Sequence, residues 1–208
     1  MDDAQHRFLE GLPLVRPTDP RWARRALGDL DALLSDHAHC EHKAASTALA
    51  LIGRHGDLPE LVRPLMALAQ EELLHFRQVL DLLEARGAAL GRPRPDRYVR
   101  ALLDRCLREP GGIGALGDRL LVCALVEARS CERFRRLAAV LAQDAKAGAP
   151  ELGAFYGRLA TAEGRHWELF ERLARHAAPA SRVTGRLGQF VRIEAEIVGD
   201  LPLEARIH

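Results

Sequence analysis

Apolar residues recur every three to four positions along most of the chain, which is the spacing of one buried face on an α-helix. The pattern predicts four long helices, over residues 22–55, 59–86, 118–141 and 151–176. Two shorter amphipathic segments predict a short helix over residues 97–109 and an additional C-terminal helix over residues 182–198. We therefore expect an all-α fold.

Proline and glycine residues mark the segments between these helices. Three prolines predict an irregular lead-in over residues 1–20, and the turn sequence Gly56-Asp57-Leu58-Pro59 separates the first two long helices. Residues 87–117 form a second-to-third connection that is long enough to lead the chain from one end of a four-helix bundle to the other. A polar stretch over residues 143–150 separates the last two long helices.

Four polar side chains interrupt the apolar faces of the second and fourth long helices in the same way. Each helix carries a Glu-x-x-His pair, Glu72 with His75 and Glu163 with His166. A Glu and a His three positions apart project from one side of a helix, so both can reach a single point in the core of a bundle. The two pairs together offer two carboxylates and two imidazoles.

The first long helix supplies a further carboxylate at the same depth. Glu41 lies on its apolar face among small alanines, 14 residues before His55, and Glu72 lies 13 residues after Pro59. At a rise of about 1.5 Å per residue, the turn between the two helices brings these carboxylates nearly level. Glu41 is therefore our third candidate ligand position.

The third long helix offers two candidates, Glu127 and Glu132. An internal repeat favours Glu132, because Glu41 and Glu132 are 91 residues apart, as are Glu72 and Glu163.

The position around the helix axis favours Glu127. The residues three and four positions before and after Glu127 all have small, uncharged side chains: Cys123, Ala124, Ser130 and Cys131. Those around Glu132 include three arginines: Ala128, Arg129, Arg135 and Arg136. A core-facing Glu132 would carry guanidinium groups inward with it. We choose Glu127 and expect Glu132 at the surface, paired with Arg129 or Arg136.

Four carboxylates and two imidazoles from four helices are the ligand set of di-iron and di-manganese bundle proteins. The six predicted metal ligands are Glu41, Glu72, His75, Glu127, Glu163 and His166. Two divalent ions balance four buried carboxylates, which are otherwise costly to bury. Zinc fits less well because it prefers fewer ligands in tetrahedral geometry.

A pair of irons with open positions can bind dioxygen and, with two external electrons, insert one oxygen atom into a C–H bond. We assign no catalytic side chain beyond the metal ligands. Such chemistry needs an apolar pocket that excludes water. The candidate lining residues are aromatic: Phe76, Phe134, Phe155, Trp167 and Phe170.

Composition and length limit the remaining possibilities. A chain of 208 residues with 48% hydrophobic residues is large enough for one well-buried core, so we expect a single domain over residues 1–208. The four cysteines lack Cys-x-x-Cys spacing, which argues against a zinc site or a disulfide framework and suits the reducing cytoplasm. The sequence shows neither a secretory signal pattern nor an apolar run of bilayer length, so we expect no membrane association.

The formal net charge of +1 excludes a global positive field of the kind that attracts nucleic acid to strongly basic proteins. Any contact with RNA must therefore come from local patches. One basic run comprises Arg92, Arg94, Arg97 and Arg100, and a second comprises Arg129, Arg133, Arg135 and Arg136. Arginine can fork onto phosphates, but a solvated or salt-bridged surface is the favoured interpretation of both runs.

Four segments resemble the tRNA-(2-methylthio-N6-isopentenyladenosine) hydroxylase family. They are residues 36–45 (DHAHCEHKAA), 71–76 (EELLHF), 127–134 (EARSCERF) and 163–166 (EGRH). Glu-x-x-His pairs are shared by ferritin-like di-iron proteins in general, whereas the stretch that begins at Glu127 is specific to this family. The resemblance covers roughly residues 22–190.

The resemblance implies a ferritin-like non-haem di-iron monooxygenase. Its substrate would be the hypermodified adenosine beside the anticodon of tRNA, whose isopentenyl group is hydroxylated with dioxygen and electrons from a donor protein or reductant. By position it implies the same six ligands, including Glu127. Two alternatives are a ferritin-like di-iron enzyme acting on a small hydrophobic molecule, and a non-catalytic iron-binding or storage bundle.

Overall fold

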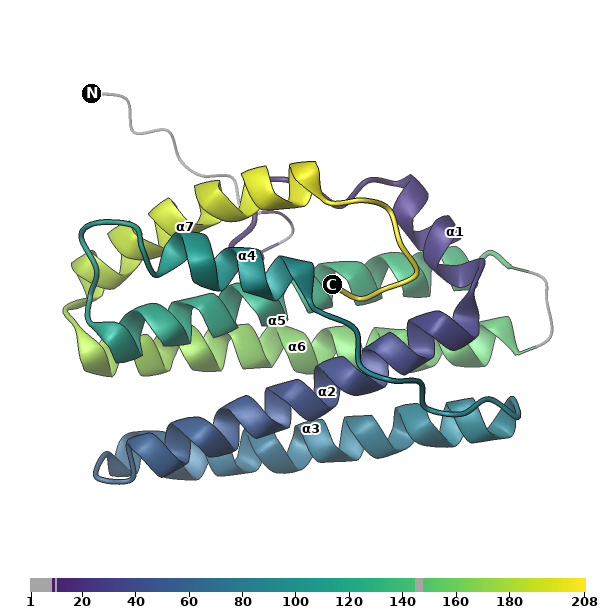
Figure 1. Ribbon diagram of the computed structural model, residues 1–208, viewed down its shortest axis with the longest axis horizontal. Coiled ribbons are helices and arrows are strands. Elements are labelled where there is room, and N and C mark those ends of the chain that lie inside the picture. Colours follow the sequence, from purple (N-terminus) through teal and green to yellow (C-terminus); the bar gives the residue numbers. More distant parts are fainter. Residues whose placement is uncertain (1–8, 10, 145–147) are drawn as a thin grey trace. The chain divides into compact units, whose positions relative to one another are not determined.

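The computed structural model describes residues 9, 11–144 and 148–208. Among these residues it contains seven helices and no β-strand (Figure 1). The helices are α1 (Arg21–Leu27), α2 (Leu30–Arg54), α3 (Pro59–Ala85), α4 (Arg97–Cys106), α5 (Ala115–Leu141), α6 (Ala149–Ala177) and α7 (Ala180–Asp200). The predicted all-α class, the long connection before α5 and the additional C-terminal helix α7 are confirmed.

The chain divides into two compact units, each described here by itself. The α2–α3 unit comprises Arg21–Pro95 and Leu203–His208. The α5–α6 unit comprises Met1–Pro20 and Asp96–Pro202, as far as those residues are described.

In the α2–α3 unit, α2 and α3 form an antiparallel pair joined by a short turn (Figure 1). Pro59 begins α3, where its fixed φ angle suits the first turn and its missing N–H is not needed. Apolar side chains from both helices fill the interior of the pair, among them Leu34, Ala38, Leu65 and Val79. Small alanines on α2 leave room for larger polar groups.

The continuous helix predicted over residues 22–55 is wrong, because the chain breaks between α1 and α2. Gly28 is a poor helix former, and Asp29 caps α2 by accepting a hydrogen bond from the Ala32 amide at 3.2 Å. A side-chain cap of this kind starts a new helix even where the apolar spacing continues. The break leaves α1 as a separate two-turn helix that packs on α2.

In the α5–α6 unit, α5 and α6 form a second antiparallel pair, and α4 and α7 also pack against α5 (Figure 1). As a result, α5 has buried side chains on every side rather than along one stripe. Charged residues on its outer faces must therefore find partners inside the protein.

The third long helix, predicted to begin at residue 118, has a different start in the structure. The helix begins three residues earlier, after Gly114, whose φ angle of 100° suits glycine. Asp118 instead accepts two hydrogen bonds from the buried Arg186 of α7, at 3.0 and 2.9 Å, and one from the Ile113 amide. This pair fastens the start of α5 to α7.

No helix in the described ranges is both long and apolar enough to cross a membrane.

Candidate metal centre

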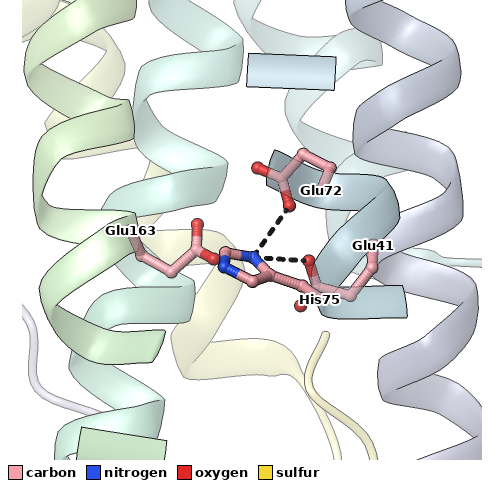
Figure 2. A group of neighbouring side chains, drawn as sticks. All are labelled: Glu41, Glu72, His75 and Glu163. Carbon is pink, nitrogen blue, oxygen red and sulfur yellow. Dashed lines mark ion pairs between the residues drawn. The ribbon is translucent and has the colours of Figure 1, made fainter. Parts of the chain in front are cut away.

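The α2–α3 unit brings together three of the predicted ligands, Glu41, Glu72 and His75 (Figure 2). One donor atom from each lies within 4.8 Å of the other two. His75 Nδ1 lies 3.6 Å from Glu41 Oε2 and 3.5 Å from Glu72 Oε2. All three side chains are buried, with exposed fractions of 4%, 1% and 6%. We call these residues the α2–α3 triad.

The α5–α6 unit contains a second set of the same composition, Glu127, Glu163 and His166. One donor atom from each again lies within 4.8 Å of the others, and His166 Nδ1 lies 3.4 Å from Glu163 Oε2. All three are buried. We call these residues the α5–α6 triad. Each Glu-x-x-His pair thus projects from one side of its helix, toward a carboxylate of the antiparallel partner helix.

The donor chemistry of each triad fits a divalent metal. Two carboxylates and one imidazole within a few ångströms present oxygen and nitrogen donors suited to iron, manganese or zinc. Ligands about 2.1 Å from one ion lie roughly 3.0–3.4 Å apart at tetrahedral or octahedral angles. The nitrogen-to-oxygen separations of 3.4–3.6 Å are close to that spacing. Two buried carboxylates so close together also repel each other unless a cation or a proton joins them.

His37 adjoins the α2–α3 triad and has no role in the sequence-based prediction. It lies one turn before Glu41 on α2, is fully buried, and its Nε2 is 2.7 Å from Glu41 Oε1. Burial, together with the nearby His75, lowers the pKa of His37 to about 3, so its imidazole is neutral. The sequence contained a signal for this contact, because His37 and Glu41 are four residues apart on one predicted helix and therefore share a face of it.

The surface position predicted for Glu132 is wrong, although both of its predicted partners are present. Glu132 is only 5% exposed. It accepts hydrogen bonds from Arg129 at 3.1 Å, from Arg136, and from the Thr18 amide and hydroxyl. Burial raises the pKa of its carboxyl, but Arg129, Thr18 and Arg136 outweigh burial and lower it overall. The guanidinium groups of Arg129 and Arg136, together with Thr18, thus hold the Glu132 carboxylate within the α5–α6 unit.

Arg129 and Arg133, considered above for phosphate binding, are buried instead of exposed. Arg129 is fully buried and forms a two-pronged pair with Glu194 of α7, at 2.8 and 2.9 Å. Glu194 also accepts a hydrogen bond from Tyr98 of α4. Burial and the neighbouring Arg129 lower the pKa of Arg133 to about 10. These side chains tie α5 to α4, α7 and the lead-in.

The predicted pocket aromatics fall in different surroundings. Phe134 and Phe155 both pack against Tyr156 in the α5–α6 unit, with ring centroids 5.5 Å apart in each case. Phe76 packs against His42 in the α2–α3 unit at 5.8 Å. Phe170 is buried and Trp167 is half-buried. Their role as pocket lining stays a prediction.

Relatives of this chain point to one class of enzyme. Two are named tRNA 2-(methylsulfanyl)-N(6)-isopentenyladenosine(37) hydroxylase. The Pseudomonas putida protein is 38% identical over 193 residues, which are 92% of this chain and 89% of the relative. The Salmonella typhimurium protein is 29% identical over 241 residues, covering 92% and 86%.

A solved Synechococcus structure, described as Protein 43 with aldehyde deformylating oxygenase activity, is also similar. It is 33% identical, with a TM-score of 0.81 over 94% of both chains. This likeness to a helical oxygenase confirms the predicted ferritin-like fold class. The model of the tRNA-(MS[2]IO[6]A)-hydroxylase (MiaE) family matches residues 7–208. Because this match spans nearly the whole sequence, the chain belongs to the tRNA-(MS[2]IO[6]A)-hydroxylase family.

Proposed function

We propose that this protein hydroxylates the isopentenyl group of 2-methylthio-N6-isopentenyladenosine in tRNA, next to the anticodon, using dioxygen. The observation that carries the proposal is the family match over residues 7–208. The names of the two bacterial relatives, which are tRNA hydroxylases, agree with it. On this proposal the protein is an oxidoreductase that modifies tRNA.

We propose further that a pair of iron ions is the cofactor, bound by the α2–α3 triad and the α5–α6 triad. The support is the chemistry of each triad: two buried carboxylates and one imidazole with donor atoms within 4.8 Å. Four carboxylates would balance the charge of two ferrous ions, so that neither triad would carry net charge into the interior. The single domain predicted over residues 1–208 is part of this proposal.

When bound, the irons would activate dioxygen with two external electrons, so that one oxygen atom enters a C–H bond and the other leaves as water. The side chains of the two triads have the chemistry and the burial that such a reaction requires. The imidazoles and carboxylates of the two triads would hold the metal, and their burial would keep water from the reacting atoms. Phe134 and Tyr156, which pack against each other in the α5–α6 unit, are large buried side chains of the kind that such chemistry needs around it.

The partners that follow are the anticodon arm of tRNA and an electron donor, either a protein or a small reductant. With tRNA as the substrate, the reaction is proposed to take place in the cytoplasm. Exposed arginines near α4 are the remaining candidates for phosphate contacts. Arg100 and Arg108 are 81% exposed but already lie near Asp104, at 3.8 and 3.7 Å. A salt-bridged, solvated face therefore remains the favoured interpretation of the basic run from Arg92 to Arg100.

One alternative has a specific observation in its favour. The Synechococcus structure carries an aldehyde deformylating activity in its description, so a small hydrophobic substrate is the second candidate. The tRNA reaction is preferred because the P. putida relative is more similar, at 38% identity against 33%. The names of these relatives describe hydroxylases and an oxygenase, so they give no support to the iron-storage alternative.

The test is reconstitution of the full chain with ferrous iron under anaerobic conditions, followed by labelled dioxygen, a reductant and tRNA that carries the prenylated nucleoside. Nucleoside analysis should show the hydroxylated product with one labelled oxygen atom. Parallel reactions contain a long-chain aldehyde, or tRNA that lacks the prenyl group. Turnover of the aldehyde without hydroxylation of tRNA would overturn the proposal in favour of the alternative.

A further inference from the structure

The side chain that touches Glu41 from its own helix is His37. The imidazole is fully buried, and its Nε2 lies 2.7 Å from Glu41 Oε1, well within hydrogen-bond range. An ionised carboxylate can only accept hydrogen bonds, so the proton of this contact belongs to Nε2 of the imidazole. His37 is therefore the donor and Glu41 Oε1 the acceptor.

This bond distinguishes the two oxygens of Glu41. Oε1 is engaged by His37, whereas Oε2 points to His75, 3.6 Å from its Nδ1. A carboxylate restrained through one oxygen presents the other one in a fixed direction. Because Glu41 has three rotatable side-chain bonds, it would otherwise sample several orientations in the space that the neighbouring alanines leave.

Asp36, the residue before His37 on α2, is held by the C-terminal segment of the same unit. The Asp36 carboxylate accepts a hydrogen bond from the Arg206 guanidinium at 3.0 Å and another from the Ile207 amide at 2.8 Å. The Arg206 carbonyl in turn accepts a hydrogen bond from the Trp22 indole at 3.2 Å. Segment 203–208 thus fixes the rotation of α2 within the α2–α3 unit, one turn before Glu41.

From this arrangement we propose that His37 is a positioning residue that holds Glu41 as a one-oxygen metal ligand. The inference rests on the proposed iron site. It goes beyond that site because it assigns a residue outside the six ligands. Outer groups that hydrogen-bond to metal ligands contribute roughly 10–100-fold to metal affinity. Loss of the His37 donor should weaken the binding of one of the two ions by about this factor.

The proposal is tested with three variants of the full chain. His37→Phe keeps a planar ring but removes the donor. His37→Gln keeps a donor that can reach a carboxylate four residues later on a helix. His39→Gln is the control, because His39 lies on the same helix but contacts the Gly91 carbonyl instead, at 2.7 Å. Should His37→Phe not fold, His37→Leu replaces it.

The readouts are anaerobic titration with ferrous iron against a competing chelator, and urea unfolding of the metal-free protein. We expect His37→Phe to bind one ion about 10–100-fold more weakly, and His37→Gln and His39→Gln to bind both ions as the wild type does. Wild-type affinity in His37→Phe would overturn the proposal. A His37→Gln variant as weak as His37→Phe would also overturn it, since it would make the imidazole itself the required group. A wild-type protein that binds no iron would instead refute the proposed function.

Discussion

Two buried glutamates on α5, Glu127 and Glu132, provide a sharp test because the structure gives them opposite roles. Each is to be changed to Gln, which removes a charge with little change in volume. Glu127 belongs to the α5–α6 triad, whereas Glu132 is held by Arg129, Arg136 and Thr18. Glu132→Gln should therefore destabilise the metal-free protein, and Glu127→Gln should weaken metal binding.

The magnitudes follow from the contacts. Glu132 accepts hydrogen bonds from two guanidinium groups and from the amide and hydroxyl of Thr18. A glutamine places an amide N–H against some of these donors, and breaking a buried charged pair costs about 3–5 kcal/mol. We expect Glu132→Gln to lose about 3 kcal/mol of unfolding free energy, or about 6–12 °C in Tm for a chain of this length. Glu127→Gln relieves repulsion with Glu163 and should gain about 1 kcal/mol in the metal-free state.

The assay is urea unfolding of chelator-treated protein, paired with a colorimetric measurement of iron per chain after iron-replete expression. Iron should fall in Glu127→Gln and stay at the wild-type level in folded Glu132→Gln. The reasoning is refuted if Glu132→Gln loses iron while its metal-free stability is unchanged, or if Glu127→Gln destabilises the metal-free protein as strongly as Glu132→Gln does. Either result would favour Glu132 as the ligand on α5.

Three further predictions concern pH, a buried pair and metal binding. Because the folded-state pKa of Glu132 is below its ordinary value of 4.5, the stability it provides is present above pH 4.5 and is lost as the pH falls through the folded-state pKa. Below pH 4.5, the unfolding free energy of the metal-free wild type, measured in urea, should therefore fall more steeply with falling pH than that of Glu132→Gln. Equal pH dependence in the two proteins would contradict the buried pairing with Arg129. Arg186→Met leaves Asp118 buried without its guanidinium and should cost about 3–5 kcal/mol in urea unfolding; a loss no larger than that of the exposed control Arg182→Met would argue against the pair. Ferrous iron at 100 times its Kd should stabilise the wild type by about 2.7 kcal/mol per independent site, and an unchanged unfolding midpoint would count against metal binding.

The helices themselves were predictable because their apolar stripes are regular and their ends carry strong signals. Pro59 opens α3 within one residue of the predicted start, and the predicted fourth long helix differs from α6 by two residues at its start and one at its end. The three-residue spacing of each Glu-x-x-His pair also placed both members on one side of a helix. Periodicity was informative wherever a helix buries a single face.

Periodicity failed where a helix is covered on several sides. Glu132 and Arg129 were assigned to the surface because they lie off the main stripe of α5, yet α4 and α7 pack over that part of the helix. Their partners, Thr18 and Glu194, are 111 and 65 residues away from Arg129 in sequence. Local spacing cannot reveal such contacts. The buried Glu132 does bring a guanidinium group inward, as expected, because Arg129 is buried with it.

On our proposal, six side chains from four helices bind two iron ions. Anaerobic titration of the metal-free full chain with ferrous iron, followed by Mössbauer spectroscopy after exposure to dioxygen, tests it most directly. We expect saturation at two irons per chain, with both ions oxidised to the ferric state by dioxygen. Saturation at one iron, or no tight binding at all, would contradict the proposed ligand set.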